Sequence, residues 1–159
     1  MERTHTAAHA RAARSIVELL GGPLAHPFAP LLDARVRQFS LTEGLADAHR
    51  RWGHVQEVIV QNFLPKPGTA MHAHPPCPAD EYLEAVALAR IILPPDVHLQ
   101  APPNLSDDFG PLLDSGIDDW GGVSPVTADH VNPERPWPAI DRLRAVTEAR
   151  GHTLAPRLT

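Results

Sequence analysis

Short apolar runs alternate with helix-like stretches along the last two thirds of the chain. The runs cover residues 58–60, 97–99 and 117–120, and the stretches between them cover residues 80–93 and 106–116. Leu83, Val86, Ala87 and Ile91 recur at nearly helical spacing in the first stretch. Strands that alternate with helices pair in parallel, because each helix carries the chain back to the starting edge. The sequence therefore predicts an α/β fold.

Helix ends have recognisable signals in this part of the chain. Pro94 and Pro95 end the first helix, Ser106 is a good N-cap, and Gly116 suits the end of a short helix. A last helix is expected over residues 136–151, where Gly151 provides the end. Residues 153–159 fit no element.

The N-terminal quarter has weaker patterns. Residues 7–20 can form a helix, and Ser40 or Thr42 can cap a second helix that ends near Trp52 and Gly53. Residues 27–39 fit no element. We expect an irregular helical segment over residues 1–45, degenerate or truncated, and the organised part over residues 46–159.

Composition narrows the class of protein. A chain of 159 residues that is 43% hydrophobic and 21% charged can bury one ordinary core. Its net charge of −5 argues against nucleic acid as a partner, because such binding depends on clustered Lys and Arg. The longest apolar stretch, residues 85–93, is interrupted by Arg90, and neither a signal peptide nor a membrane span is visible. We expect a cytoplasmic protein, and the single cysteine fits a reducing compartment.

Polar side chains gather at the expected strand ends. In parallel folds the loops after the strands open on one side, where ligands bind. Amides offer donors and acceptors for an uncharged heterocycle, and Lys66 suits an anionic group. The alternative is that these side chains only cap helices and satisfy loop backbone. The residues are Gln61, Asn62, Gln100, Asn104, Asp118, Asp119 and Ser124.

Two rival sites have suitable residue types but incomplete patterns. His72, His74 and Cys77 could bind zinc only with a distant fourth ligand such as His54, His98 or His130, and a proline-rich exposed loop is the simpler interpretation. A hydrolase triad of Ser124, His130 and Asp118 or Asp119 lacks the GxSxG elbow. Trp120 and Trp137 are expected in the core or a pocket wall.

Longer motifs point to a known family. Residues 54–62, the loop Pro65-Lys66-Pro67-Gly68-Thr69, and residues 86–95, 100–106 and 116–138 resemble the C-terminal part of the radical S-adenosylmethionine domain of FO synthase, the 7,8-didemethyl-8-hydroxy-5-deazariboflavin synthase. The resemblance covers about residues 46–159, and a weaker similarity lies between residues 12 and 28.

The resemblance implies a TIM-type barrel in which a CxxxCxxC loop holds a 4Fe-4S cluster that binds S-adenosylmethionine. Such an enzyme, a carbon-nitrogen lyase, closes a tyrosine-uracil adduct into the deazaflavin ring with loss of ammonia. The pocket for substrate or S-adenosylmethionine would be lined by Gln61, Asn62, Lys66, Gln100, Asn104, Asp118, Asp119, Ser124 and His130.

The chain departs from the family pattern in three places. Cys77 stands alone, and each cluster iron needs a strong soft ligand, so the cluster ligands are absent from this sequence. Residues 29–36 lack the family's glycine-rich GIxxGxGE segment, and Leu64 stands where its NFRPKPGT motif has arginine.

A complete barrel of this type needs at least about 200 residues. We therefore expect a partial barrel that contains the last three strand-helix units, from a truncated or decayed gene or from an enzyme split over a second chain that carries the cluster loop. Such a chain would be inactive alone, and unpaired strand edges would favour poor solubility or self-association. The alternative is a non-catalytic α/β fragment that acts only by association with another chain.

Overall fold

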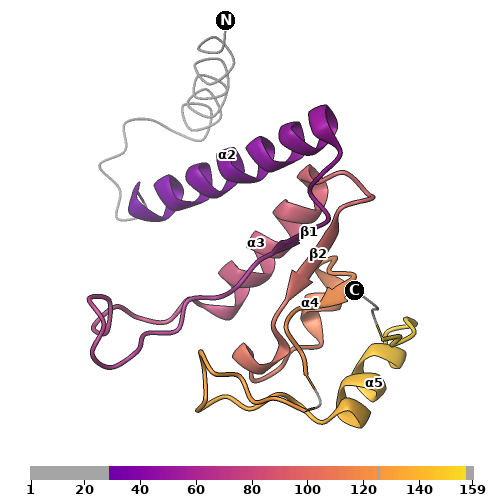
Figure 1. Ribbon diagram of the computed structural model, residues 1–159. Coiled ribbons are helices and arrows are strands. Elements are labelled where there is room, and N and C mark those ends of the chain that lie inside the picture. Colours follow the sequence, from indigo (N-terminus) through magenta and orange to yellow (C-terminus); the bar gives the residue numbers. More distant parts are fainter. Residues whose placement is uncertain (1–28, 125, 157–159) are drawn as a thin grey trace, which may run out of the picture.

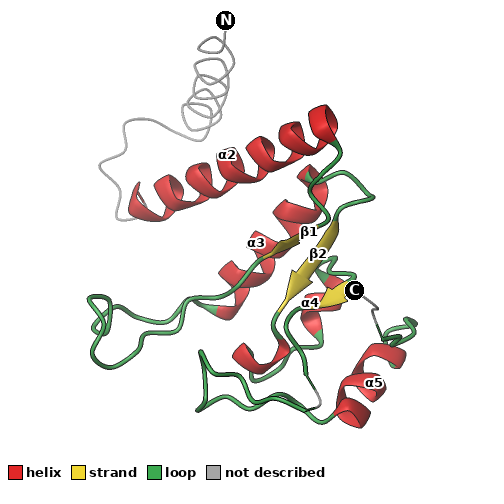
Figure 2. Ribbon diagram, in the orientation of Figure 1, coloured by secondary structure: helices red, strands yellow, loops and turns green. Residues whose placement is uncertain are grey.

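The computed structural model describes residues 29–124 and 126–156, which form helices around a small parallel sheet (Figures 1 and 2). The chain order is α2 (Ala29–Trp52), β1 (Glu57–Ile59), α3 (Ala79–Ile92), β2 (His98–Ala101), a 3-10 turn η1 (Pro103–Leu105), α4 (Pro111–Asp114), β3 (Asp119–Trp120) and α5 (Ile140–Glu148).

The three strands lie in the order β1-β2-β3, and both pairings are parallel. Val58 lies opposite Leu99, and Gln100 lies opposite Asp119. The predicted α/β class and the parallel pairing are therefore confirmed. The small sheet is compatible with strand-helix units of a larger assembly.

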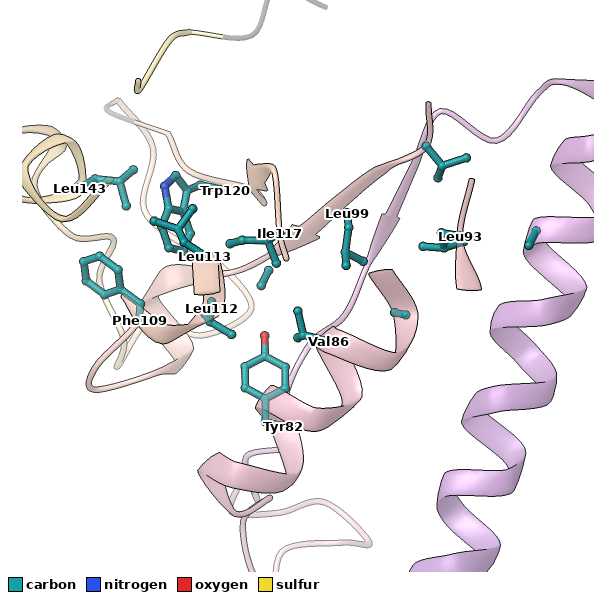
Figure 3. Close-up of a cluster of buried hydrophobic side chains, with 14 residues drawn as sticks. Tyr82, Val86, Leu93, Leu99, Phe109, Leu112, Leu113, Ile117, Trp120 and Leu143 are labelled. Atoms are coloured by element: carbon teal, nitrogen blue, oxygen red, sulfur yellow. The ribbon is translucent and has the colours of Figure 1, made fainter. Parts of the chain in front are cut away.

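One face of the sheet forms the floor of the hydrophobic core. Leu99 and Ala101 of β2 are fully buried on this face, beside Trp120 of β3. Figure 3 shows how side chains from α3, α4 and α5 meet them, among them Val86, Leu112 and Leu143. Helices thus cover this face, but Ile91, one of the four residues whose spacing predicted the first helix, is 80% exposed.

The opposite face is polar and partly open. Because side chains alternate along a strand, Glu57 and Ile59 of β1, Gln100 of β2 and Asp119 of β3 share this face. The Gln100 Nε2 group donates to Glu57 Oε2 at 2.9 Å and to Asp119 Oδ2 at 2.8 Å, which ties the three strands together. Ile59 remains 51% exposed. Parallel sheets are usually covered on both faces, but within the described residues only one face of this sheet packs in the hydrophobic core.

Helix α2 packs along α3 and runs in the same direction. Gln38 Nε2 donates to the Ala85 carbonyl at 3.0 Å, and eleven residues later His49 Nε2 lies 3.0 Å from Asp96 Oδ2, just beyond α3. Ala46 is fully buried in the same interface. Helix α2 therefore belongs to the helical layer outside the sheet (Figure 1).

The N-terminal boundary of α2 differs from the sequence prediction. The expected end at Trp52 is confirmed, but the described part of the helix extends back to Ala29 and includes residues 29–39, for which no element was predicted. Ser40 and Thr42 are interior residues, so their prediction as caps was wrong. The Thr42 hydroxyl donates to the Gln38 carbonyl at 2.9 Å, a bond that an interior threonine makes. The predicted domain boundary between residues 45 and 46 lies within this helix, and the predicted helix over residues 7–20 lies outside the described residues.

Prolines explain two other boundary differences. Ser106 ends η1 and caps no helix, because α4 begins only at Pro111, a residue favoured in the first helical turn. Helix α5 begins at Ile140 because Pro136 and Pro138 disfavour helical backbone before them. Among the described helices, none combines the length and the apolar character needed to cross a bilayer.

Candidate functional site

A cavity of about 250 Å³ lies at the C-terminal ends of the three strands. Its walls come from the segment after each strand and from a later loop within residues 129–137. The lining residues are Ile59, Gln61, Pro102, Leu105, Gly121, Gly122, Asp129, Val131, Asn132 and Trp137. The three strand-end segments thus meet at one cavity, as their places in a parallel sheet predict.

Two glycines let the third strand end approach the cavity closely. A Cβ atom on Gly121 would lie 3.1 Å from Gln100 Oε1, so a side chain there would crowd the residue that ties the sheet together. Gly122 has a φ of +74°, and a Cβ atom there would lie 3.2 Å from the Trp137 ring. Trp137 therefore forms a wall against bare backbone, and Trp120 lies in the core, as predicted for the two tryptophans.

Two asparagine side chains hold the cavity walls in place. Asn62 Nδ2 donates to the Leu105 carbonyl at 2.8 Å, which joins the first strand end to the second. Asn104 Nδ2 donates to Asp129 Oδ2 at 2.9 Å and to the Arg135 carbonyl at 2.8 Å. The Oδ1 atoms of both asparagines are buried without a hydrogen-bond partner in the part of the chain that the structure describes. Each therefore retains an unused acceptor close to the cavity.

Asp129 organises the late loop of the cavity wall. Its Oδ1 accepts the N–H groups of Val131 at 2.8 Å and Asn132 at 3.0 Å, and its Oδ2 accepts the side-chain amides of Asn104 and Asn132. Burial opposes ionisation, but these bonds from Asn132 and Asn104 lower the pKa of Asp129 to about 2. The carboxylate is thus a charged anchor for the loop.

Sequence reasoning missed Asp129, although a local signal existed. An aspartate that accepts N–H groups two and three residues later is an Asx-type turn, and Asp129-His130-Val131-Asn132 has that pattern. The contact with Asn104, twenty-five residues away, could be found only in the fold.

Lys66 joins the loop after β1 to the cavity wall. Its Nζ donates to the carbonyl of Val131 and lies 3.7 Å from Glu134 Oε1. Of the nine candidate residues, Gln61 lines the cavity, and Asn62, Asn104 and Lys66 contact its walls. Gln100 lies below, on the polar sheet face, with Asp119 beside it.

Asp118 and Ser124 make local structural contacts. Asp118 directly precedes β3, and its carboxylate accepts the Leu99 N–H at 2.7 Å and lies 3.0 Å from His98 Nδ1, toward the start of β2. The Ser124 hydroxyl accepts the N–H groups of Val126 and Thr127, at 3.3 and 3.1 Å. His130 is exposed beside the cavity residues 129 and 131. The Asp118, Ser124 and His130 side chains therefore make no catalytic triad contacts in this structure.

The His72 and Cys77 region contains local turns. His72 Nδ1 lies 2.9 Å from the Thr69 carbonyl, and Cys77 Sγ donates to the Pro78 carbonyl at 3.5 Å. Burial, with a smaller contribution from Glu81, raises the pKa of the Cys77 thiol. Over residues 29–124 and 126–156, no three His, Cys, Asp or Glu side chains lie together as metal ligands. One cysteine cannot supply the thiolates of an iron-sulfur cluster, so the residues of this sequence do not fit that group.

Comparison with known proteins gives one consistent group of relatives. The chain is 55% identical over 114 residues to FO synthase of Mycobacterium tuberculosis and 57% identical over 111 residues to FO synthase of Nocardia farcinica. It is 58% identical over 118 residues to 7,8-didemethyl-8-hydroxy-5-deazariboflavin synthase of Methanopyrus kandleri. These matches cover 69–73% of the chain but only 13% of the first two relatives and 35% of the third. No family model and no solved structure matches.

Proposed function

We propose that this chain, a relative of the FO synthases, forms the C-terminal strand-helix part of a synthase that makes 7,8-didemethyl-8-hydroxy-5-deazariboflavin for deazaflavin coenzymes. The observation that carries the proposal is the cavity at the C-terminal ends of β1, β2 and β3. Its lining residues lie within segments that carry the resemblance to the family. We infer that the three strand-helix units are part of a TIM-type barrel and that the synthase works in the cytoplasm.

The cavity chemistry supports a planar, uncharged ring as ligand. Gln61 offers both a donor and an acceptor at the wall, and the buried Oδ1 atoms of Asn62 and Asn104 are acceptors whose Nδ2 groups are already used. Trp137 and Ile59 supply apolar surface. We propose that this cavity binds the tyrosine-uracil adduct or S-adenosylmethionine through Gln61, Asn62, Lys66 and Asn104, the candidates that line the cavity or contact its walls.

The radical-forming chemistry lies outside this sequence. A 4Fe-4S cluster would supply the electron for cleavage of S-adenosylmethionine, but this sequence has only one cysteine to bind it. The part of this chain is therefore to bind and orient the substrate. A carbon-nitrogen lyase reaction would need the cluster from a polypeptide segment that this sequence does not contain.

A binding titration tests the proposed pocket. The probe is 7,8-didemethyl-8-hydroxy-5-deazariboflavin, the compound in the relatives' name, followed by its own absorption and fluorescence. We expect saturable binding that the Gln61→Ala change weakens about fivefold, because one hydrogen bond contributes about 1 kcal/mol. The matched control is Ser124→Ala, whose hydroxyl serves a turn. No binding, or an equal loss in both variants, would contradict the proposal.

Anaerobic iron-sulfur reconstitution tests whether this chain can bind a cluster by itself. The purified chain should acquire no cluster absorbance and should not cleave S-adenosylmethionine, because it has one thiol. Cleavage of S-adenosylmethionine by the chain alone would contradict the proposal that the cluster must come from another polypeptide segment.

A further inference from the structure

Helix α2 has an exposed apolar stripe beside its buried face. Leu41, Leu45 and Trp52 follow one another at steps of four and seven residues, which places them on one side of the helix. Their exposed fractions are 71%, 40% and 62%. The neighbouring side of α2, with Thr42 and Ala46, is buried against the rest of the molecule. The stripe therefore has an apolar composition typical of an interface, and within residues 29–124 and 126–156 it stays exposed.

The position of α2 relates the stripe to the edge of the sheet. In a parallel α/β layer, each helix lies over the strands that it connects. Helix α3 joins β1 to β2, and α2 precedes β1 and lies alongside α3 (Figure 1). Helix α2 consequently lies over the place that a strand before β1 would occupy.

The outer edge of β1 is ready to pair with such a strand. The N–H of Val60 donates to Gln100, and the carbonyl of Gln56 accepts from His98, so the even-numbered residues bond to β2. Because backbone groups alternate along a strand, those of Ile59 point to the outer edge. Within the described residues, β1 has only β2 as a strand neighbour.

We propose that the edge of β1 and the stripe of α2 together form a docking surface for a polypeptide that carries the part of an FO synthase preceding this segment. Its last strand pairs in parallel with β1, and its apolar side chains pack under Leu41, Leu45 and Trp52. The length of the relatives indicates this partner. The match covers only 35% or 13% of them, so they are about three to eight times longer than the stretch that they share with this chain. The inference rests on the proposed relationship to the synthases but not on ligand binding in the cavity.

Capture by a synthase fragment tests the surface. The fragment is the part of a synthase that precedes its matched segment. We choose, from the three relatives named above, a synthase whose preceding part captures its own matched segment when the two are expressed as separate polypeptides. Co-expressed with this full chain, it should form a stable complex, measured by affinity capture and size-exclusion chromatography. Failure to capture this chain, when the fragment captures its own segment, would overturn the proposal.

Three variants locate the contact. Leu45→Glu places a charge in the stripe, and Ile59→Pro removes an edge N–H that the sheet does not use, so each should weaken the complex at least tenfold. The matched control is Ile91→Glu, which changes an aliphatic residue of α3 that is 80% exposed, and it should bind like wild type. Circular dichroism and thermal melting of each variant alone verify folding.

The same variants distinguish the proposed partner from other occupants of this surface, and they distinguish docking from ligand binding in the cavity. Equal binding by all three variants would show that the fragment docks elsewhere. A dimer of this chain that the fragment cannot displace, and that Leu45→Glu dissociates, would make a second copy the occupant and overturn the proposal. Because capture needs no deazaflavin, loss of ligand binding in Gln61→Ala leaves this test unaffected.

Discussion

Asn104 and Asp129 show how single residues define the cavity. Asn104 is buried beyond the end of β2, and its amide holds the carboxylate of Asp129, which in turn fixes the backbone of Val131 and Asn132. Removing one member leaves buried polar groups without partners, and such groups cost more free energy than the bond itself contributes. The late cavity wall therefore depends on one charged hydrogen-bond centre.

Replacing Asp129 by Asn should loosen this wall. The new amide nitrogen would face the Nδ2 donors of Asn104 and Asn132, so we expect a loss of about 1–2 kcal/mol in the free energy of unfolding. Urea denaturation at pH 7 measures it, and amide hydrogen exchange at residues 131 and 132 should accelerate. Unchanged exchange there would show that the carboxylate does not hold the loop.

The pH dependence of this contribution follows from the lowered pKa. Because the folded pKa of Asp129 is about 2, below its ordinary value, the carboxylate stabilises the fold fully above pH of about 4. The contribution declines as the pH falls through about 2. The carboxyl carbon of Asp129 should titrate in that range by NMR, and a midpoint near pH 4 would contradict the bonding described.

The turn between α4 and β3 shows how an element boundary is fixed. Helix α4 has only four residues and ends before Gly116, whose φ is +102°. The Arg90 side chain lies over this turn, and its guanidinium donates to the carbonyls of Leu93, Pro94 and Val97 beyond the end of α3. Arg90 thus contacts both the segment after α3 and the turn after α4.

The Gly116→Ala change should be clearly destabilising. A Cβ atom would lie 2.6 Å from Arg90 Cγ, and the left-handed backbone disfavours any side chain, so we expect a loss of about 2 kcal/mol or more. The matched control is Gly44→Ala within α2, where nothing lies within 4 Å of the new Cβ. Alanine should stabilise that helix by up to about 1 kcal/mol. Chemical denaturation of both variants measures the contrast, and a neutral Gly116→Ala result would show that Arg90 moves freely.

On the scale of the whole molecule, the parallel sheet is covered unevenly. Helices α3, α4 and α5 bury one face, whereas Ile59 on the other face, and Leu41 and Trp52 on α2, stay exposed. Exposed apolar surface and unpaired strand edges promote association. The described part of the chain therefore exposes apolar side chains both on one sheet face and on α2.

The purified chain alone should therefore self-associate weakly. Sedimentation velocity should give an average mass above 17.3 kDa that rises with concentration. Leu45→Glu should shift the average toward the monomer, and Ile91→Glu should not. A concentration-independent monomer with a cooperative thermal transition would contradict this expectation and would show that the open surfaces are adequately solvated.

Local sequence signals determined the order and type of the elements. Apolar spacing in residues 80–93, the stop at Pro94 and Pro95, and the glycines after α4 and α5 all depend on neighbours within a few residues. The same patterns predicted the parallel pairing, because a helix between two strands carries the chain back to the edge at which the first strand began. The relationship to the FO synthases was also readable, because long ordered motifs survive in the chain.

Only the tertiary structure decided which polar residues reach the cavity. Asp118, expected at a strand end, precedes β3 and binds the start of β2, whereas Asp129, with no strand before it, joins the cavity wall. The reason is that cavity contacts connect residues that are far apart in sequence, and a shift of one or two residues in a short strand moves a side chain to another end or face. The helical conformation of residues 29–39 was also not predicted, and in the fold Gln38 of this segment donates to the carbonyl of Ala85 in α3.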